Sequence, residues 1–318
     1  MTAKSLFKNP MNITVADPSM LFYDGKYYCY GTNSKGGFYA YSSKDLVTWT
    51  PEGKVFQKYD GFYGVDCFWA PEVYYRNGKF VMAFSCRDKN KRHSITVALS
   101  DSPAGPFKDV NNGLPVFCPE YSVIDASLLF DDDGRIYMYY SKDCSTNIVC
   151  GIHESHVYVV ELSPDLKKVI SEPIFLTRPD CDWEKKSGNE WRWNEGPCCF
   201  KRNGRYYLMY TANYYATIHY AVGYAVSDSP TGPFVKSPQN PILSADGKTT
   251  MGTGHNNYFF SPDGSEMYTV YHSLKNKKNN DEGRVPNIDR MHFDSDGKLS
   301  ILGPTVTEQP LPSGTVIN

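Results

Sequence analysis

The chain has 318 residues, of which 41% are hydrophobic and 15% aromatic, and its 25 Tyr and 17 Phe favour pleated, half-buried strands. Its 33 basic and 35 acidic residues are interspersed and give a formal net charge of -2, so no basic tract marks a nucleic-acid surface. No run approaches the roughly 18 apolar residues of a membrane span. We therefore expect neither nucleic acid nor a membrane as a partner.

The N-terminal segment, MTAKSLFKNP, has no apolar stretch long enough for a signal peptide. We therefore expect a cytoplasmic location for the sequence as written. A leader removed earlier would instead place the protein in the periplasm or outside the cell.

A short hairpin pattern recurs five times along the chain. Each copy joins two aromatic-rich, β-forming runs through an Asx-Gly or similar turn, as in LFYDGKYYCYGT and FKRNGRYYLMYT. The turn glycines are Gly25, Gly78, Gly134, Gly204 and Gly264, spaced by about 50 to 70 residues. This spacing accommodates four short strands and variable loops, which is the size of one propeller blade.

Helical periodicity is missing between these hairpins, which argues against the alternating strands and helices of a Rossmann fold or a TIM barrel. No Pro- or Gly-rich linker divides the chain convincingly. We therefore predict an all-β fold: a five-bladed β-propeller with four antiparallel strands per blade, forming a single domain over residues 1–318.

Residues that can carry chemistry stand eight or nine positions before each hairpin glycine: Asp17, Trp69, Asp125, Glu195 and His255. The first strand of each propeller blade lines the central channel, so these five side chains should converge on one pocket. An Asp before a Pro, as at Asp17, is usually a turn residue. Asp125 and Glu195, however, have hydrophobic or aromatic neighbours, where an ionised carboxylate is costly to bury unless it is paired or functional.

Three carboxyl groups across a pocket suit the cleavage of glycosidic bonds. A protonated carboxyl donates to the leaving oxygen, while an ionised one activates water or attacks the sugar. Opposite protonation states at one pH require different environments, and a third negative charge nearby raises the pKa of the acid. The pattern predicts one acid, one base and one carboxylate that tunes the acid.

Five short motifs carry a resemblance to a known family: ADPS at 16–19, WAPE at 69–72, IDAS at 124–127, NEGP at 194–197 and GTGH at 252–255. Together, in this order, they resemble glycoside hydrolase family 43, and the match covers essentially the whole chain. The resemblance implies a five-bladed propeller acting on oligo- or polysaccharides that contain arabinose or xylose.

The same resemblance implies an inverting hydrolase and assigns roles to the three acids. Asp17 would be the general base, Glu195 the general acid, and Asp125 the residue that raises the pKa of Glu195 and orients it. Inversion needs the base and acid roughly 6.5–9.5 Å apart, so that water fits between them.

Three further residues are expected to bind substrate or metal. His255 resembles a family histidine on the channel axis, often beside a water-coordinated Ca²⁺, although a neutral histidine hydrogen-bonded without metal is an equal alternative. The chemistry itself requires no cofactor. Trp69 could stack on a sugar ring or belong to the core. Arg290 resembles a family arginine that contacts sugar hydroxyls, with a surface ion pair as the alternative.

The sequence leaves the substrate specificity open. Our first expectation is an exo-acting α-L-arabinofuranosidase, followed by β-D-xylosidase and then endo-arabinanase. The aromatic, charged insertion at 181–193 could wall off one end of a cleft and favour removal of terminal sugars. A non-catalytic glycan-binding propeller is the alternative from another class, but binding alone needs no matched acid and base.

Overall fold

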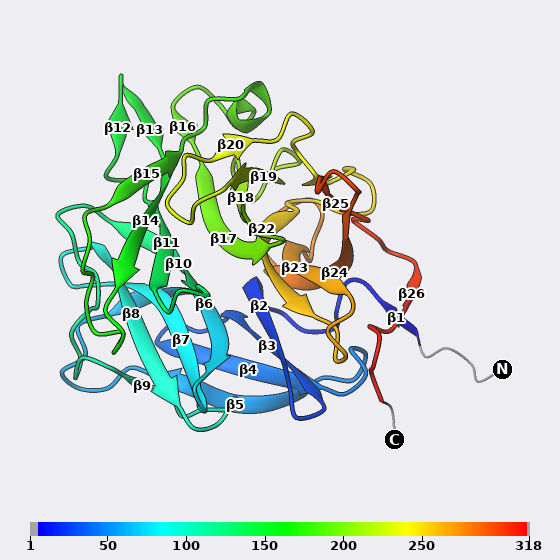
Figure 1. The fold of residues 1–318 in the computed structure, drawn as a ribbon, viewed down its shortest axis with the longest axis horizontal. Helices are drawn as coiled ribbons and strands as arrows, with labels where there is room; N and C mark the ends of the chain where they lie inside the picture. Colours follow the sequence, from blue (N-terminus) through cyan, green and yellow to red (C-terminus); the bar gives the residue numbers. More distant parts are fainter. Residues whose placement is uncertain (1–5, 317–318) are drawn as a thin grey trace.

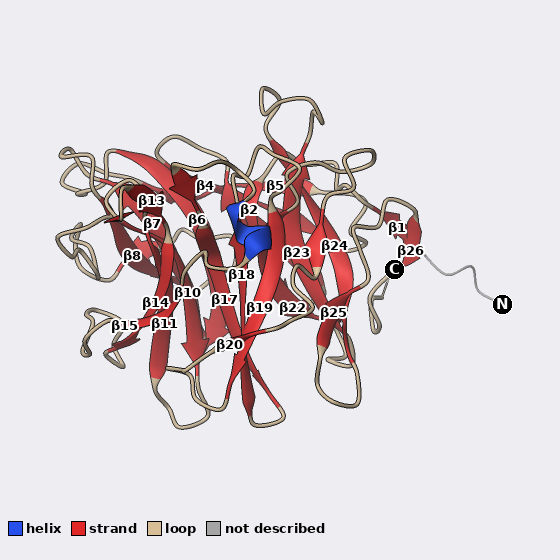
Figure 2. Cartoon of the chain, turned by 90° about the horizontal axis from the view of Figure 1, so that it is seen from above, coloured by secondary structure: helices blue, strands red, loops and turns tan. Residues whose placement is uncertain are grey.

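The computed structural model describes residues 6–316, so the ends of the predicted 1–318 domain lie outside the described residues. Within this range the fold is all-β, as predicted, with no α-helix and one 3₁₀ turn, η1 (Asp182–Lys185). Figures 1 and 2 show strands throughout the molecule and η1 as a short helical turn between them. Among the described residues, no helix has the length and apolar character needed to cross a membrane.

Five sheets follow one another along the chain, each built from antiparallel neighbours. The first contains β2 (Ala16–Tyr23), β3 (Lys26–Thr32), β4 (Gly37–Ser43) and β5 (Thr50–Gln57), and the second β6 (Asp66–Arg76), β7 (Lys79–Arg87), β8 (His93–Ser100) and β9 (Lys108–Asp109). The third contains β10 (Val123–Phe130), β11 (Ile136–Lys142), β14 (His156–Leu162) and β15 (Ile174–Thr177). The fourth contains β17 (Asn194–Arg202), β18 (Arg205–Ala212), β19 (Ala221–Ser227) and β20 (Val235–Lys236), with β21 (Leu243–Ser244) also paired to β19. The fifth contains β22 (Gly254–Phe260), β23 (Met267–Leu274), β24 (Arg284–Phe293) and β25 (Leu299–Ile301).

Two smaller sheets complete the structure. Strand β1 (Leu6–Lys8) pairs with β26 (Glu308–Pro310), so the beginning and end of the described chain lie side by side. Strands β12 (Ile148–Val149), β13 (Ile152–Glu154) and β16 (Trp191–Arg192) form a three-stranded sheet outside the five larger ones. This small sheet includes part of the predicted 181–193 insertion.

The five predicted hairpins join the first and second strands of the five large sheets. Their glycines have φ values of +72° to +83°, a left-handed conformation that glycine adopts without steric cost. A Cβ at any of these five positions would meet nothing within 4 Å, so backbone conformation and not crowding explains the glycine. Asp24, Asn77 and Asn203, which precede three of them, also have positive φ, as a two-residue type I′ turn requires.

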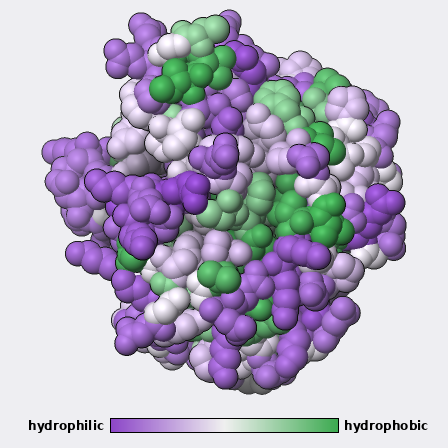
Figure 3. Space-filling view, turned by 90° about the vertical axis from the view of Figure 1, so that its left-hand side faces the viewer, coloured by the Kyte–Doolittle hydropathy of each residue, from purple (hydrophilic) through white to green (hydrophobic). Residues whose placement is uncertain are grey.

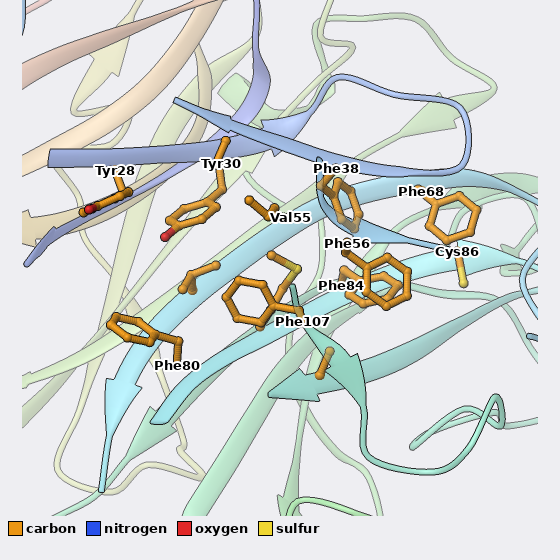
Figure 4. Packing of buried hydrophobic residues seen from close by; sticks show 14 of the residues in the cluster. Tyr28, Tyr30, Phe38, Val55, Phe56, Phe68, Phe80, Phe84, Cys86 and Phe107 are labelled. Atoms are coloured by element: carbon orange, nitrogen blue, oxygen red, sulfur yellow. The ribbon is translucent and has the colours of Figure 1, made fainter. Parts of the chain in front are cut away.

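Five hydrophobic clusters form the core, one between each pair of neighbouring sheets. Figure 4 shows the cluster between the first and second sheets, where the Phe56 ring lies 4.7 Å from that of Phe84, which in turn lies 5.1 Å from Phe38. Burying each such side chain stabilises the fold by roughly 1.5–3 kcal/mol. The cluster between the fifth and first sheets connects the last sheet back to the beginning of the chain.

The first strands, β2, β6, β10, β17 and β22, surround the middle of the molecule in Figure 1, and each contacts the first strands of the sheets on both sides. Residues on these five strands therefore face a common central space.

Candidate active site

A cavity of about 380 Å³ opens at the ends of the five central strands. It receives at least one side chain from each of them. The lining consists of Asp17, Trp69, Ile124, Asp125, Asp143, Cys144, Ser155, Trp193, Glu195, Tyr214, Tyr215, Tyr220, His255 and Arg284. Five of the six residues singled out from the sequence are thus brought together, and Arg290 is the exception.

An irregularity in the strand pairing marks the cavity end of every central strand. The register shifts there by one or more residues, and one residue in each shift has a left-handed backbone: φ is 49° at Asp17, 45° at Ala70, 58° at Asp125, 55° at Gly196 and 50° at His255. Bulges of this kind re-aim side chains next to active sites. Each non-glycine residue held in this region costs on the order of 1–3 kcal/mol, which the surrounding packing must offset.

These bulges refine the predicted alignment between sheets. Asp17, Asp125 and His255 occupy equivalent backbone positions, but the corresponding residues of the second and fourth sheets are Ala70 and Gly196. Trp69 and Glu195 precede that position by one residue. Glu195 therefore reaches the cavity from a different point on its strand than the two aspartates.

Asp17 is buried and surrounded by nitrogen groups. Arg284 donates from Nη1 to its Oδ1 at 2.6 Å, and Nδ1 of His255 and of His272 lie 3.4 and 3.3 Å from the same oxygen. Burial alone would raise the pKa of Asp17, but the charge of Arg284 and the two imidazoles hold it well below its usual range. Asp17 is therefore ionised at neutral pH.

His272 stays neutral next to this carboxylate. Its Nδ1 accepts a hydrogen bond from the Asp17 backbone N–H at 3.1 Å, which places the ring proton on Nε2. Burial and the nearby Arg284 lower the pKa of His272 to about 3. The positive charge balancing Asp17 thus comes from Arg284 and not from this histidine.

Glu195 has the opposite environment. Burial first, and then the negative charge of Asp125, raise the pKa of Glu195 well above its usual value, while a hydrogen bond from Tyr220 Oη at 3.0 Å acts in the other direction. Asp143, another carboxyl group on the cavity wall, adds to the increase. Glu195 can therefore hold a proton at a pH where Asp17 has lost its own.

Asp125 interacts with both Asp17 and the backbone next to Glu195. Its Oδ2 accepts a hydrogen bond at 3.0 Å from the backbone N–H of Gly196, the residue that follows Glu195. Burial and the charge of Asp17 raise the pKa of Asp125 to about 6, even though His255 acts to lower it. Above that pH its negative charge faces Glu195 and opposes the ionisation of that residue.

Both the backbone conformation at position 196 and the neighbouring side chain of His255 require glycine there. With φ at +55°, a Cβ at this position would lie 3.2 Å from the His255 ring, tighter than ordinary contact. The glycine of the NEGP motif thus makes room for His255 while its N–H holds Asp125.

Arg290 is not among the cavity-lining residues, which argues against the sugar-binding role expected for it. Its Nε donates to Oε1 of Glu266 at 3.2 Å, its Nη2 donates to the Pro310 carbonyl at 3.1 Å, and its guanidinium lies over the Tyr268 ring. On β24 it stands six residues from Arg284, about 20 Å along an extended strand. Arg284, at the cavity end of that strand, takes the place expected for Arg290.

Trp69 and Glu72 from the WAPE motif lie at different depths. Trp69 lines the cavity and stacks on His93, with ring centroids 4.6 Å apart. Glu72 is buried and hydrogen-bonded to Tyr74; burial raises the pKa of Glu72 to about 7 despite that bond. It is not among the cavity-lining residues, in agreement with a structural role.

A larger hollow of about 840 Å³ lies elsewhere, between β19, β20 and the turn at Gly297. Its acidic side chains, Asp228 and Asp296, are 92% and 71% exposed, so water screens their charges. It has no group of buried carboxyls comparable to the central cavity. The central cavity is therefore the better candidate for the active site.

Carboxyls with opposed pKa shifts, gathered in an aromatic-lined cavity, are the groups that hydrolysis of a glycosidic bond requires. The chain belongs to glycosyl hydrolases family 43, whose model matches residues 7–299. Members of this family hydrolyse glycosidic bonds with inversion at the anomeric carbon.

Individual relatives show how close the match is. The chain is 32% identical over 303 residues to a β-D-galactofuranosidase of Aspergillus niger, covering 89% of this chain and 81% of that protein. It is 26% identical to xylosidase/arabinosidase 43A of Humicola insolens, covering 94% and 98% of the two chains. A solved structure of a thermostable family-43 glycoside hydrolase superposes with a TM-score of 0.91 at 43% identity, covering 97% of this chain and 99% of that one.

Proposed function

We propose that the protein is an exo-acting α-L-arabinofuranosidase that removes terminal pentose residues from plant cell-wall glycans. The observation that carries the chemistry is the contrast between Asp17, stabilised as a carboxylate by Arg284, and Glu195, stabilised as an acid by burial and Asp125. Both side chains line one cavity. We also propose that the five large sheets are the blades of one five-bladed propeller, since each packs against two neighbours.

In the proposed mechanism Asp17 is the general base. It removes a proton from a water molecule as the water oxygen bonds to the anomeric carbon. At the same time the bond from that carbon to the glycosidic oxygen breaks, and Glu195 gives its proton to the departing oxygen. Asp125 maintains the raised pKa of Glu195 and fixes the backbone beside it through Gly196. Proton exchange with solvent restores both groups.

Support for the exo mode comes from the 181–193 insertion. It ends with Trp193 in the cavity wall, two residues before Glu195, and Tyr214 and Tyr215 close the wall nearby. An aromatic wall of this kind on one side of the cavity suits a chain end better than the middle of a polymer.

Relatives favour a furanose sugar as the first choice. β-D-Galactofuranose has the ring configuration of α-L-arabinofuranose with one additional carbon, and the galactofuranosidase is the relative at 32% identity. A second relative is described as both xylosidase and arabinosidase, which keeps β-D-xylosidase as the alternative. An extracellular endo-α-(1→5)-L-arabinanase of Bacillus subtilis, at 25% identity, keeps endo-arabinanase as the third.

A structural Ca²⁺ beside His255 is a separate proposal that no step above uses. Ca²⁺ prefers six to eight oxygen ligands. Within residues 6–316, the one group of three His, Cys, Asp or Glu side chains that converge closely enough to hold an ion is Asp180, Cys181 and Glu184, away from His255. An ion at His255 would therefore depend mainly on water for its ligands.

A substrate screen tests the proposed function. We expect release of 4-nitrophenol from the α-L-arabinofuranoside to exceed release from the β-D-xyloside and β-D-galactofuranoside at neutral pH. Debranched arabinan should yield free arabinose without shortening internally. Failure on every pentoside would overturn the proposal, and faster cleavage of the xyloside would favour the alternative.

A further inference from the structure

A row of partly exposed rings leaves the cavity on the side of Glu195. Trp193 lines the cavity, and the Trp191 ring lies 6.4 Å from it with planes inclined by 19°. The His153 ring stacks on Trp191 at 3.9 Å with planes inclined by 10°. Trp191 is 38% exposed, although an indole of this size is usually buried.

Strand alternation explains why these side chains point the same way. Residues two apart on an extended segment share a face, so Trp191, Trp193 and Glu195 project to one side. The intervening residues project to the other side: Arg192 reaches the buried Glu154 at 3.4 Å, and Asn194 donates to Thr177 Oγ1 at 3.3 Å. The row therefore leads along one strand face to the proposed acid.

The small sheet extends this row outward. His153 lies directly beside Trp191 in the parallel pairing of β13 with β16, and Ile148 lies opposite His153 in the pairing of β12 with β13. Ile148 is 60% exposed. The β12–β13 hairpin projects at the upper left of Figure 1, and Figure 3, which views that side, shows hydrophobic residues gathered on the projection at its upper edge.

Several hydrogen bonds hold the row in place. The N–H groups of His153 and Ser155 donate to the carbonyls of Glu190 and Arg192 at 2.8 and 2.9 Å. The His153 ring is fixed through Nδ1, 2.9 Å from the Cys144 carbonyl. Aromatic groups fixed in this way lose little conformational entropy when they bind a ligand.

The geometry points to a carbohydrate-binding platform, formed by Trp193, Trp191, His153 and Ile148, for the leaving-group side of a glycan chain. This inference rests on the proposed function, because a general acid at Glu195 places the departing oxygen, and the sugars beyond it, on this side. Aromatic faces pack against the apolar faces of sugar rings. The platform binds the sugar units beyond the cleaved bond in an arabinose-bearing polysaccharide.

Trp191 is the residue to test, because it belongs to the platform and lies outside the cavity lining. We would compare Trp191→Leu, which keeps an apolar side chain without an aromatic face, with Trp191→Phe, which restores one. Phe260→Leu is the matched control. Phe260 is 48% exposed and lies at the end of β22 opposite to the cavity. Thermal unfolding would verify that each variant folds.

Kinetics with short and long substrates give the first readout. For Trp191→Leu we expect KM for soluble arabinoxylan to rise about tenfold, which corresponds to about 1.4 kcal/mol, with a much smaller change for 4-nitrophenyl α-L-arabinofuranoside. Trp191→Phe should recover most of the loss, and Phe260→Leu should match the wild type on both substrates. Equal changes on both substrates, or none on arabinoxylan, would overturn the platform while leaving the arabinofuranosidase proposal intact.

Gel retardation by arabinoxylan gives a second readout that needs no turnover. In an Asp17→Asn background, we expect the gel containing arabinoxylan to retard the protein, and Trp191→Leu to abolish most of that retardation. This result would support the platform even if no pentoside were hydrolysed and the proposed function failed. Retardation unaffected by Trp191→Leu, or absent from the parent protein, would contradict it.

Discussion

Arg284 and Asp17 are 267 residues apart in sequence, yet Nη1 of the arginine lies 2.6 Å from Oδ1 of the aspartate. Arg284 begins β24, and its carbonyl also accepts a hydrogen bond from the N–H of Val15, two residues before Asp17. The contact that keeps Asp17 ionised thus depends on the meeting of the first and last sheets. Arg284 therefore both joins the first sheet to the last and holds the Asp17 carboxylate.

Replacing Arg284 by Gln should move the acid limb of the pH profile. As the proposed base, Asp17 would act only when ionised, so activity should fall as pH drops through its pKa. Loss of the guanidinium raises that pKa, and we expect the acid limb of kcat/KM to shift upward by about 1–3 pH units. Arg290→Gln on the same strand is the control and should leave the profile in place, because Arg290 lies outside the cavity. Superimposable acid limbs for Arg284→Gln and wild type would argue against this role.

The Asp125→Asn variant should move the alkaline limb in the opposite sense. As the proposed acid, Glu195 would donate only when protonated, so activity should fall as pH rises through its pKa. Removing the negative charge of Asp125 lowers that pKa, and the alkaline limb should move to lower pH. The difference should be largest above about pH 6, where Asp125 is ionised. Asn can still accept from Gly196 N–H, so an unchanged alkaline limb would show that Asp125 only positions its neighbour.

Two glycine variants separate backbone strain from active-site crowding. Gly204→Ala, in a hairpin with open space around the new Cβ, should destabilise the fold by about 1–2 kcal/mol without changing kcat. Gly196→Ala should cost a similar amount and also lower kcat by about tenfold or more, because its Cβ would displace the His255 ring. Urea denaturation and kcat on an aryl substrate measure the two effects. Equal kcat values for both variants would contradict the account of Gly196.

Lys236 should be important for stability because its partner is completely buried. Its Nζ lies 2.7 Å from Oε2 of Glu184, whose other oxygen accepts from Tyr210 at 2.7 Å. Lys236→Met leaves that carboxylate without its cation, and we expect unfolding free energy to fall by about 3–5 kcal/mol in urea titrations. Lys298→Met, whose partner Asp296 is 71% exposed, should change stability little. Similar effects for the two lysines would refute this explanation.

Much of the fold could be predicted because its turns and its family motifs are local. The five hairpin glycines need only their own neighbours to define them, and the acidic residues before them point to one shared space. The exact alignment could not be predicted by counting back from the glycines, because the connections after β10 and β22 are longer than the two-residue turns after β2, β6 and β17. Trp69 and Glu195 therefore lie one position before the residues equivalent to Asp17, Asp125 and His255.

The partners of the acids were harder to predict. Arg284, His272 and Tyr220 reach the cavity through pairings between strands, and no short motif marks them. Arg290 was chosen because its sequence context resembled a family pattern, but position along β24 decides which arginine meets Asp17. In the pairing of β23 with β24, Arg284 lies opposite Leu274 and Pro286 opposite His272, so Arg284 is the arginine at the cavity end of β24.

Leaving-group dependence distinguishes the proposed acid, Glu195, from the proposed base, Asp17. Rates for wild type, Glu195→Ala and Asp17→Ala would be measured on aryl α-L-arabinofuranosides with good and poor leaving groups. We predict that Glu195→Ala keeps substantial activity only on the good leaving group, which departs without protonation, whereas Asp17→Ala loses activity on both. Equal losses for the two variants on both substrates would contradict the assignment.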